Sequence, residues 1–153
     1  MPKEIERKFL LTNDEWRKKA EGESYKQGYL STVAERSVRI RIKSNKGFLT
    51  VKGKTTGFTR HEFEYEIPAD DAEQMLTMCV QPIINKIRYK IKYDEHTWEI
   101  DEFFGENQGL ILAELELESE EQIFSKPPWI GNEVTGAPRY YNASLVQNPF
   151  SKW

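Results

Sequence analysis

The first groups in this chain that could do chemistry are two carboxylates and an ammonium at alternate positions, Glu4, Glu6 and Lys8. In a β-strand, alternate side chains share a face, so these three groups would point one way and Ile5 and Phe9 the other. Carboxylate oxygens ligate hard divalent cations, and an ammonium is a compact partner for an anion. The spacing therefore predicts a strand whose polar face could hold a metal ion beside an anionic substrate.

The same alternation recurs in five further stretches, each with one charged face and one apolar face. The basic rows are Arg39 and Arg41, Lys52 and Lys54, and Lys86, Arg88, Lys90 and Lys92; the acidic rows are Glu62, Glu64 and Glu66, and Glu114, Glu116 and Glu118. In an ordinary half-buried strand, charges of this kind face solvent. That explanation weakens over six strands, because the expected helices are too few to cover a second sheet.

Composition limits the class of protein. The chain has 153 residues, which we expect to form a single domain over 1–153; 31% are charged, yet 12% are aromatic, which argues against disorder. The net charge of −3 does not indicate a surface for duplex nucleic acid. Cys79 is the only cysteine, and we find neither a signal-peptide core nor an apolar run long enough to cross a membrane. We expect a soluble cytoplasmic protein without a membrane partner.

Most of the chain is expected to form antiparallel strands separated by turns. These strands cover residues 5–11, 24–31, 36–44, 48–54, 59–67, 85–93, 97–103 and 110–118. Short helices are expected over 13–22, 69–79 and 141–147, and another after Ser119, which would form a capping box with Gln122. This pattern favours a mainly antiparallel α+β fold: a closed eight-stranded β-barrel, a tunnel with a charged interior and a few short helices outside.

Rows of like charge inside a tunnel would repel one another without a ligand. The cationic rows need an anion of high charge density, and arginine forks match phosphate oxygens in pairs. Inward carboxylates would repel that anion unless a divalent cation lies between them. The chemistry that uses both kinds of row is metal-assisted attack on a chain of phosphates.

Several motifs in this order resemble the CYTH superfamily, also called triphosphate tunnel metalloenzymes. The stretch Glu4-Ile5-Glu6-Arg7-Lys8 matches its ExExK signature. The others are Gln27-Gly28-Tyr29-Leu30, Arg39-Ile40-Arg41, Arg60-His61-Glu62-Phe63-Glu64, Lys86-Ile87-Arg88-Tyr89, Glu114-Leu115-Glu116, Pro127-Pro128-Trp129 and Glu133-Val134-Thr135. The resemblance covers nearly the whole chain and implies an eight-stranded tunnel that binds a linear triphosphate.

The resemblance also implies roles for particular residues. Those that would grip the triphosphate are Lys8, Arg39, Arg41, Lys52, Lys86 and Arg88. Those that would hold Mg²⁺ or Mn²⁺ are Glu4, Glu6, Glu114 and Glu116, with Asp101 as a further ligand. Lys8 and Tyr29 would act together near the scissile phosphorus, and Glu64 would either ligate the metal or orient the attacking water. Ala137 departs from the pattern, because similar proteins often have an acidic residue there.

The function expected on these grounds is hydrolysis of inorganic triphosphate to pyrophosphate and phosphate. A class IV adenylyl cyclase or a thiamine triphosphatase would use the same tunnel on another triphosphate. A non-catalytic polyphosphate-binding module is the alternative from a different class. The apolar outer faces of the strands predict a homodimer.

Overall fold

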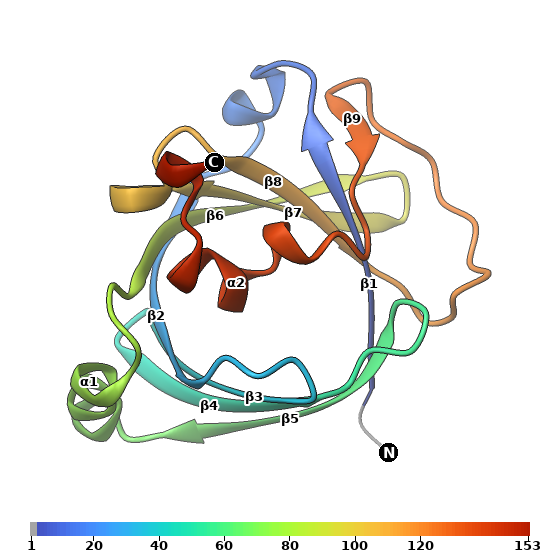
Figure 1. Ribbon diagram of the computed structural model, residues 1–153. Coiled ribbons are helices and arrows are strands. Elements are labelled where there is room, and N and C mark those ends of the chain that lie inside the picture. The colour runs from blue at the N-terminus through green and yellow to red at the C-terminus, as the bar shows by residue number, and fades with distance from the viewer. Residues whose placement is uncertain (1–2) are drawn as a thin grey trace.

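The computed structural model describes residues 3–153, and its dominant feature is a ring of antiparallel strands (Figure 1). The strands are β1 (Lys3–Leu11), β2 (Gly22–Ser31), β3 (Arg36–Lys43), β4 (Lys46–Gly53), β5 (Thr59–Ile67), β6 (Ile84–Tyr93), β7 (His96–Phe103), β8 (Ile111–Glu116) and β9 (Ile130–Glu133). The α-helices are α1 (Ala69–Met78) and α2 (Asn142–Gln147), and single 3₁₀ turns cover Glu15–Lys18, Gly105–Asn107, Pro138–Tyr140 and Phe150–Lys152.

The strand order closes the sheet on itself. The sheet runs β5-β4-β3-β2-β6-β7-β8-β1, and β1 also pairs with β5, for example Glu4 opposite Arg60. The short extra strand β9 pairs with the C-terminal end of β1, at Phe9 and Leu11. The prediction of a closed eight-stranded antiparallel barrel is therefore confirmed, whereas β9 was not foreseen.

Two helices expected from the sequence are absent from the described residues 3–153. The stretch 13–22 forms only the 3₁₀ turn Glu15–Lys18, which buries Trp16. The segment after Ser119 is not helical: its Gln122 instead accepts a hydrogen bond from the backbone N–H of Glu118, at 2.6 Å. This segment runs extended over the barrel, where Phe124 packs on the outer apolar cluster.

The turn between β3 and β4 is tighter than the sequence suggested. Ser44 and Asn45 both have positive φ, of 50° and 60°, as a two-residue hairpin turn with the twist of its strands requires. Gly47, expected in the turn, lies buried in β4 instead. A Cβ built there would lie 2.6 Å from the Cβ of Ala72, so glycine allows α1 to pack directly on the sheet.

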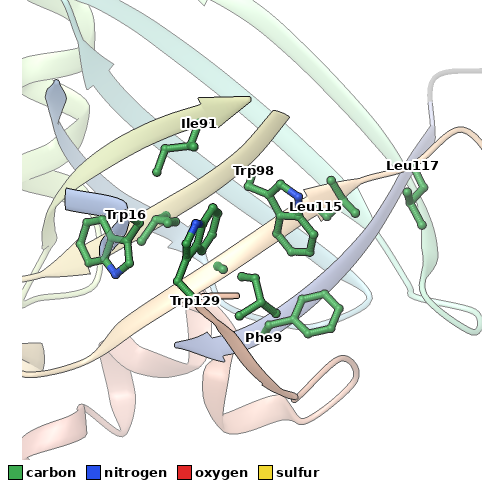
Figure 2. Close-up of a cluster of buried hydrophobic side chains, with 10 residues drawn as sticks. Phe9, Trp16, Ile91, Trp98, Leu115, Leu117 and Trp129 are labelled. Carbon is green, nitrogen blue, oxygen red and sulfur yellow. The ribbon is translucent and has the colours of Figure 1, made fainter. Parts of the chain in front are cut away.

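The largest apolar cluster lies outside the barrel, on the outer faces of β1, β7 and β8 (Figure 2). Its aromatic residues meet edge to face, with Phe9 5.4 Å and Trp129 6.1 Å from Trp98. The segment that carries Phe124 and Trp129 covers this face. The predicted apolar exterior is thus buried by the protein's own loops over this part of the barrel.

Not every helix lies outside the barrel, which corrects that part of the prediction. Helix α2 crosses the ring in Figure 1, and its Leu145 and Val146 pack with inner-face residues such as Phe103 and Leu112. Part of the barrel interior is therefore apolar and is filled by the C-terminal segment. No described helix is long and apolar enough to span a membrane.

Candidate functional site

The inner faces of the strands surround one cavity of about 450 Å³. Of the residues expected to form a site, those that line it are Glu4, Glu6, Lys8, Tyr29, Arg39, Arg41, Lys52, Glu64, Lys86, Arg88, Glu114 and Glu116. Asp101 lies behind the wall, fully buried. Strand alternation brings these residues together, because each occupies the inward parity of its strand.

Glu4 lies where the barrel closes and is held by two cations. Lys52 Nζ lies 2.9 Å from its Oε2, and Arg60 Nε lies 3.2 Å from its Oε1. Burial opposes ionisation, but these cations lower the pKa of Glu4 to about 2. Lys52 also pairs with Glu62 at 3.3 Å. Burial and the neighbouring Glu4 carboxylate raise the pKa of Glu62.

A second carboxylate group is formed across β1 and β8. Lys8 Nζ lies 3.6 Å from Glu114 Oε1, and Arg88 lies 3.8 Å from the other oxygen. These cations lower the pKa of Glu114 against the effect of burial. Glu6 has no cationic side chain within 4.0 Å in the described chain. Burial and repulsion from Glu114 raise its pKa well above the ordinary value.

Asp101 anchors two of the cations on β6. Arg88 donates to both its oxygens, at 2.7 and 2.8 Å, and Lys86 Nζ lies 2.8 Å from Oδ2. Burial opposes ionisation, yet Arg88 and Lys86 lower the pKa of Asp101 to about 2. Burial lowers the pKa of Lys86 to about 7. To ligate a metal, as expected from the sequence, Asp101 would have to give up contacts with these cations.

The arginines of β3 are less fully compensated. Arg39 donates to Thr50 Oγ1 at 3.1 Å and lies 3.8 Å from Glu64. Arg41 donates to Gln27 Oε1 at 2.9 Å and has no carboxylate within 4.0 Å among residues 3–153. Burial and repulsion from Arg39 and Arg88 lower the pKa of Arg41 to about 9. Arg41 is therefore a buried cation suited to binding an anion.

The C-terminal segment also contributes to the cavity. Tyr141 and Asn142 line it; Asn142 Oδ1 accepts hydrogen bonds from Lys86 and Gln27, each at 3.0 Å. Lys8 Nζ donates to the carbonyl of Tyr140 at 3.2 Å. Lys8 and Tyr29 share the cavity without a direct hydrogen bond in the described structure: Tyr29 accepts from Gln27 at 3.4 Å.

Sequence reasoning missed several residues that line or support the cavity. Arg60, Glu62 and Glu99 line it and have the same parity as expected site residues on β5 and β7, so strand alternation was a sufficient signal for them. Gln27 follows from the inward parity of Tyr29 on β2. Asn142 is the first residue of α2, shortly after the 3₁₀ turn Pro138–Tyr140, and no pattern in the sequence indicates that its side chain reaches the cavity.

The donor set fits a hard divalent cation. Its carboxylates supply oxygen ligands, and Glu6, Glu62 and Glu116 have raised pKa values because partial loss of solvent and neighbouring carboxylates disfavour their charged forms. A divalent cation would relieve that repulsion. Within residues 3–153, no three His, Cys, Asp or Glu side chains converge on one point as they stand. The glutamates of β1 and β8 are the carboxylates placed to hold such a cation.

Comparison with known proteins gives a consistent result. The model of the CYTH domain matches residues 2–146. A protein of Acetivibrio thermocellus named inorganic triphosphatase is 50% identical, over 100% of this chain and 99% of its own length. A protein of the same name from Nitrosomonas europaea is 35% identical, over 94% and 96%. A solved structure of an inorganic triphosphatase superposes with a TM-score of 0.66 at 33% identity, covering 95% of each chain.

Proposed function

This chain belongs to the CYTH domain family, and on that premise we propose that it is a metal-dependent hydrolase that cleaves inorganic triphosphate to pyrophosphate and phosphate. The observation that supports this most directly is a tunnel with cations and carboxylates on its inner wall, in a chain 50% identical over its full length to a protein named inorganic triphosphatase. Cations alone would suit binding, but the added carboxylates suit a metal that takes part in hydrolysis.

The cationic residues neutralise the substrate. We assign the grip on the phosphate chain to Lys8, Arg39, Arg41, Lys52, Lys86 and Arg88. Arginine can donate two parallel hydrogen bonds to one phosphate group, while each lysine supplies a point charge. These groups lie on opposite sides of the cavity, so a linear triphosphate can be held along its length. Fixed cations also stabilise charge that develops as the phosphoanhydride bond breaks.

The carboxylates hold the metal and orient water. We assign metal binding to Glu4, Glu6, Glu114 and Glu116, with Mg²⁺ or Mn²⁺ as the cation that suits oxygen ligands beside phosphate. When bound, such a cation polarises a phosphate oxygen and lowers the pKa of a coordinated water. Glu64 would accept a hydrogen bond from the attacking water. Lys8 and Tyr29 would position the scissile group from the other side.

We further propose a homodimer in a reducing, cytoplasmic compartment. Cys79, the only cysteine, is buried and serves as a packing residue beside Leu76. Tyr65 on the outer face of β5 is 59% exposed, and Phe63 beside it is half-buried. Light scattering during gel filtration tests the association, and a monomer at working concentrations would contradict it.

Phosphate release is the experiment that tests the function. Tripolyphosphate, ATP and thiamine triphosphate are compared with Mg²⁺, Mn²⁺ or a chelator. We expect turnover that needs the metal and prefers tripolyphosphate. Glu4→Gln should abolish it, whereas Glu66→Gln, the same change at an exposed position outside the cavity, should not. A preference for ATP or thiamine triphosphate would contradict the assignment of inorganic triphosphate as the substrate. Binding of tripolyphosphate without turnover would indicate a non-catalytic polyphosphate-binding module.

A further inference from the structure

Strand β2 differs from its neighbours in presenting neutral side chains to the interior, namely Tyr25, Gln27 and Tyr29. It lies between β3 and β6, which carry most of the cations of the cavity. Tyr25 is directly opposite Lys43 on one side and Lys86 on the other. The ring of Tyr25 therefore stands between two cationic strands.

Four cations surround this one ring. From β3, the guanidinium carbon of Arg41 lies 4.8 Å from the ring centroid, and Lys43 Nζ lies 5.3 Å away. From β6, Arg88 lies at 5.0 Å and Lys86 at 5.9 Å. A cation within about 6 Å of an aromatic face is attracted by the negative charge of the π-system. The attraction is larger where water is excluded, as it is here, since Tyr25 is 2% exposed.

The ring compensates the charge of Arg41, which no carboxylate reaches within 4.0 Å among residues 3–153, whereas Arg88 and Lys86 also have Asp101. Arg41 has the Tyr25 ring and the side-chain oxygen of Gln27 as its partners, and it is repelled by Arg88, which lies 5.0 Å from the centroid of the same ring. Without the ring, Arg41 would lose this partner while Arg88 stayed bound to Asp101, so the repulsion between the two guanidinium groups would act in a low-dielectric region. Arg41 would then turn away from the cavity or draw in a counter-ion.

The hydroxyl of Tyr25 does not account for this residue. It is buried and has no hydrogen-bond partner among residues 3–153. An unpaired buried hydroxyl costs stability, so a phenylalanine would serve at least as well for packing. The ring is what the four cations contact.

We propose that Tyr25 is a positioning residue of the polyphosphate site, whose ring keeps Arg41 beside Arg88 and directed into the tunnel before the substrate arrives. Such preorganisation reduces the reorganisation that binding would otherwise require. The inference rests on the proposed function only for the identity of the anion. Tyr25 is not among the residues that line the cavity, so in this proposal its ring acts through the cations and not on the substrate.

The test measures the dissociation constant of tripolyphosphate by calorimetry on the chelator-treated protein, in which metal-dependent turnover does not occur. Tyr25→Phe should bind within about twofold of the wild type and melt at the same or a higher temperature. Tyr25→Leu should bind roughly tenfold more weakly, because it loses the aromatic faces. With metal, the same change should raise KM and leave kcat largely unaltered.

Two further measurements separate positioning from general damage. Tyr89→Leu is the matched control: Tyr89 lies on the outer face of β6, edge-on to Trp16 at 5.0 Å, and its loss should lower Tm without altering affinity. A series of phenylalanines with one to three fluorines at position 25 keeps the shape of the ring while weakening its π-face. Affinity should fall stepwise along that series, even if Tyr25→Leu does not fold.

Unchanged affinity in Tyr25→Leu, or a flat fluorine series, would overturn the proposal. So would a loss in Tyr25→Phe as large as that in Tyr25→Leu, since the hydroxyl would then be the active group. Phosphate release by the wild type reports on the proposed function independently. A protein that binds tripolyphosphate but hydrolyses nothing would refute the hydrolase and still test Tyr25.

Discussion

In strands β7 and β8, successive residues alternate between an outer face, which packs in an apolar cluster, and an inner face, which points into the barrel. On the outer face, Trp98, Ile100 and Leu115 are completely buried in the apolar cluster of Figure 2. On the inner face, Asp101 and Glu114 are almost as deeply buried, but among charges. The outer face stabilises the barrel by removing apolar surface from water. The inner face concentrates charge that is only partly compensated without a ligand.

The difference shows where stability and activity reside in this protein. A slip of one residue in strand register would exchange the two faces, so the outer cluster also fixes which side chains reach the tunnel. Residues on the outer face should therefore affect stability alone. Residues on the inner face should affect activity, and should affect stability in either direction according to how well each charge is paired.

The largest effect is expected for an inner-face cation that neutralises a buried carboxylate. Arg88→Ala leaves Asp101 with Lys86 as its remaining partner. Breaking a buried pair in this way should lower the free energy of unfolding by about 3–5 kcal/mol and kcat/KM by roughly 100-fold. Chemical denaturation and phosphate release measure the two effects.

The double variant Arg88→Ala/Asp101→Ala sharpens this result. It should regain part of the lost stability, because no buried carboxylate is left unpaired, but none of the activity. Lys90→Ala is the control, since Lys90 is 51% exposed along its side chain, and it should change stability by less than about 0.5 kcal/mol. An Arg88→Ala protein as stable as the wild type would show that Lys86 alone suffices for Asp101.

A change confined to the outer face should separate stability from activity. Leu115→Ala removes a buried side chain between Arg7 on β1 and Trp98 on β7. We expect a loss of about 3 kcal/mol and a fall of about 6–12 °C in Tm. KM for tripolyphosphate, measured well below Tm, should not change. A raised KM would mean that the outer packing also tunes the tunnel.

The smallest change in stability, and one of opposite sign, is expected at Glu6. In the metal-free protein this carboxylate is half-buried beside Glu114, and its folded-state pKa is raised. The folded state then holds the Glu6 proton more tightly than the unfolded state, so stability falls as pH rises from about 4.5 through the folded-state pKa. Glu4 acts in the opposite sense: its pKa of about 2 contributes stability above pH 4.5 that is lost on acidification.

Glu6→Gln should therefore raise stability near neutral pH by on the order of 1 kcal/mol, about 2–4 °C in Tm, when measured with chelator. The same variant should lose at least about 10- to 100-fold in activity, because a proposed metal ligand is gone. Thermal melts from pH 5 to 8 provide the measurement. If the variant is less stable than the wild type across that range, Glu6 is not repelled in the free protein.

The strands and most cavity residues could be predicted from the sequence, because alternation is a local signal. The eight strands β1 to β8 all begin and end within two residues of the expected bounds. The inward position of Tyr25 was equally available from its parity with Tyr29, but a neutral residue does not attract notice in a search for charges.

The remaining features depend on tertiary contacts. Ser119 and Gln122 do approach each other, and the N–H of Gln122 donates to the Ser119 carbonyl at 3.2 Å, but the turn is not continued as a helix. Packing of Phe124 against Phe9 and Trp98 favours the extended path instead. The hydrogen bond between Lys86 and Asn142 likewise depends on how α2 enters the barrel, and no local pattern in the sequence specifies that path.

The pairing of β1 also orders events during synthesis. Strands β2 to β5 pair with their sequence neighbours and can form a sheet early, whereas β1, made before them, pairs only with β5, β8 and β9. Until those strands exist, β1 is an unprotected edge. Its alternating charges at Glu4, Glu6 and Lys8 discourage pairing with other chains, as charges on natural edge strands do. The residues assigned to metal binding would thus also disfavour aggregation of the nascent chain, and Glu6 would meet Glu114 only when the barrel is nearly complete.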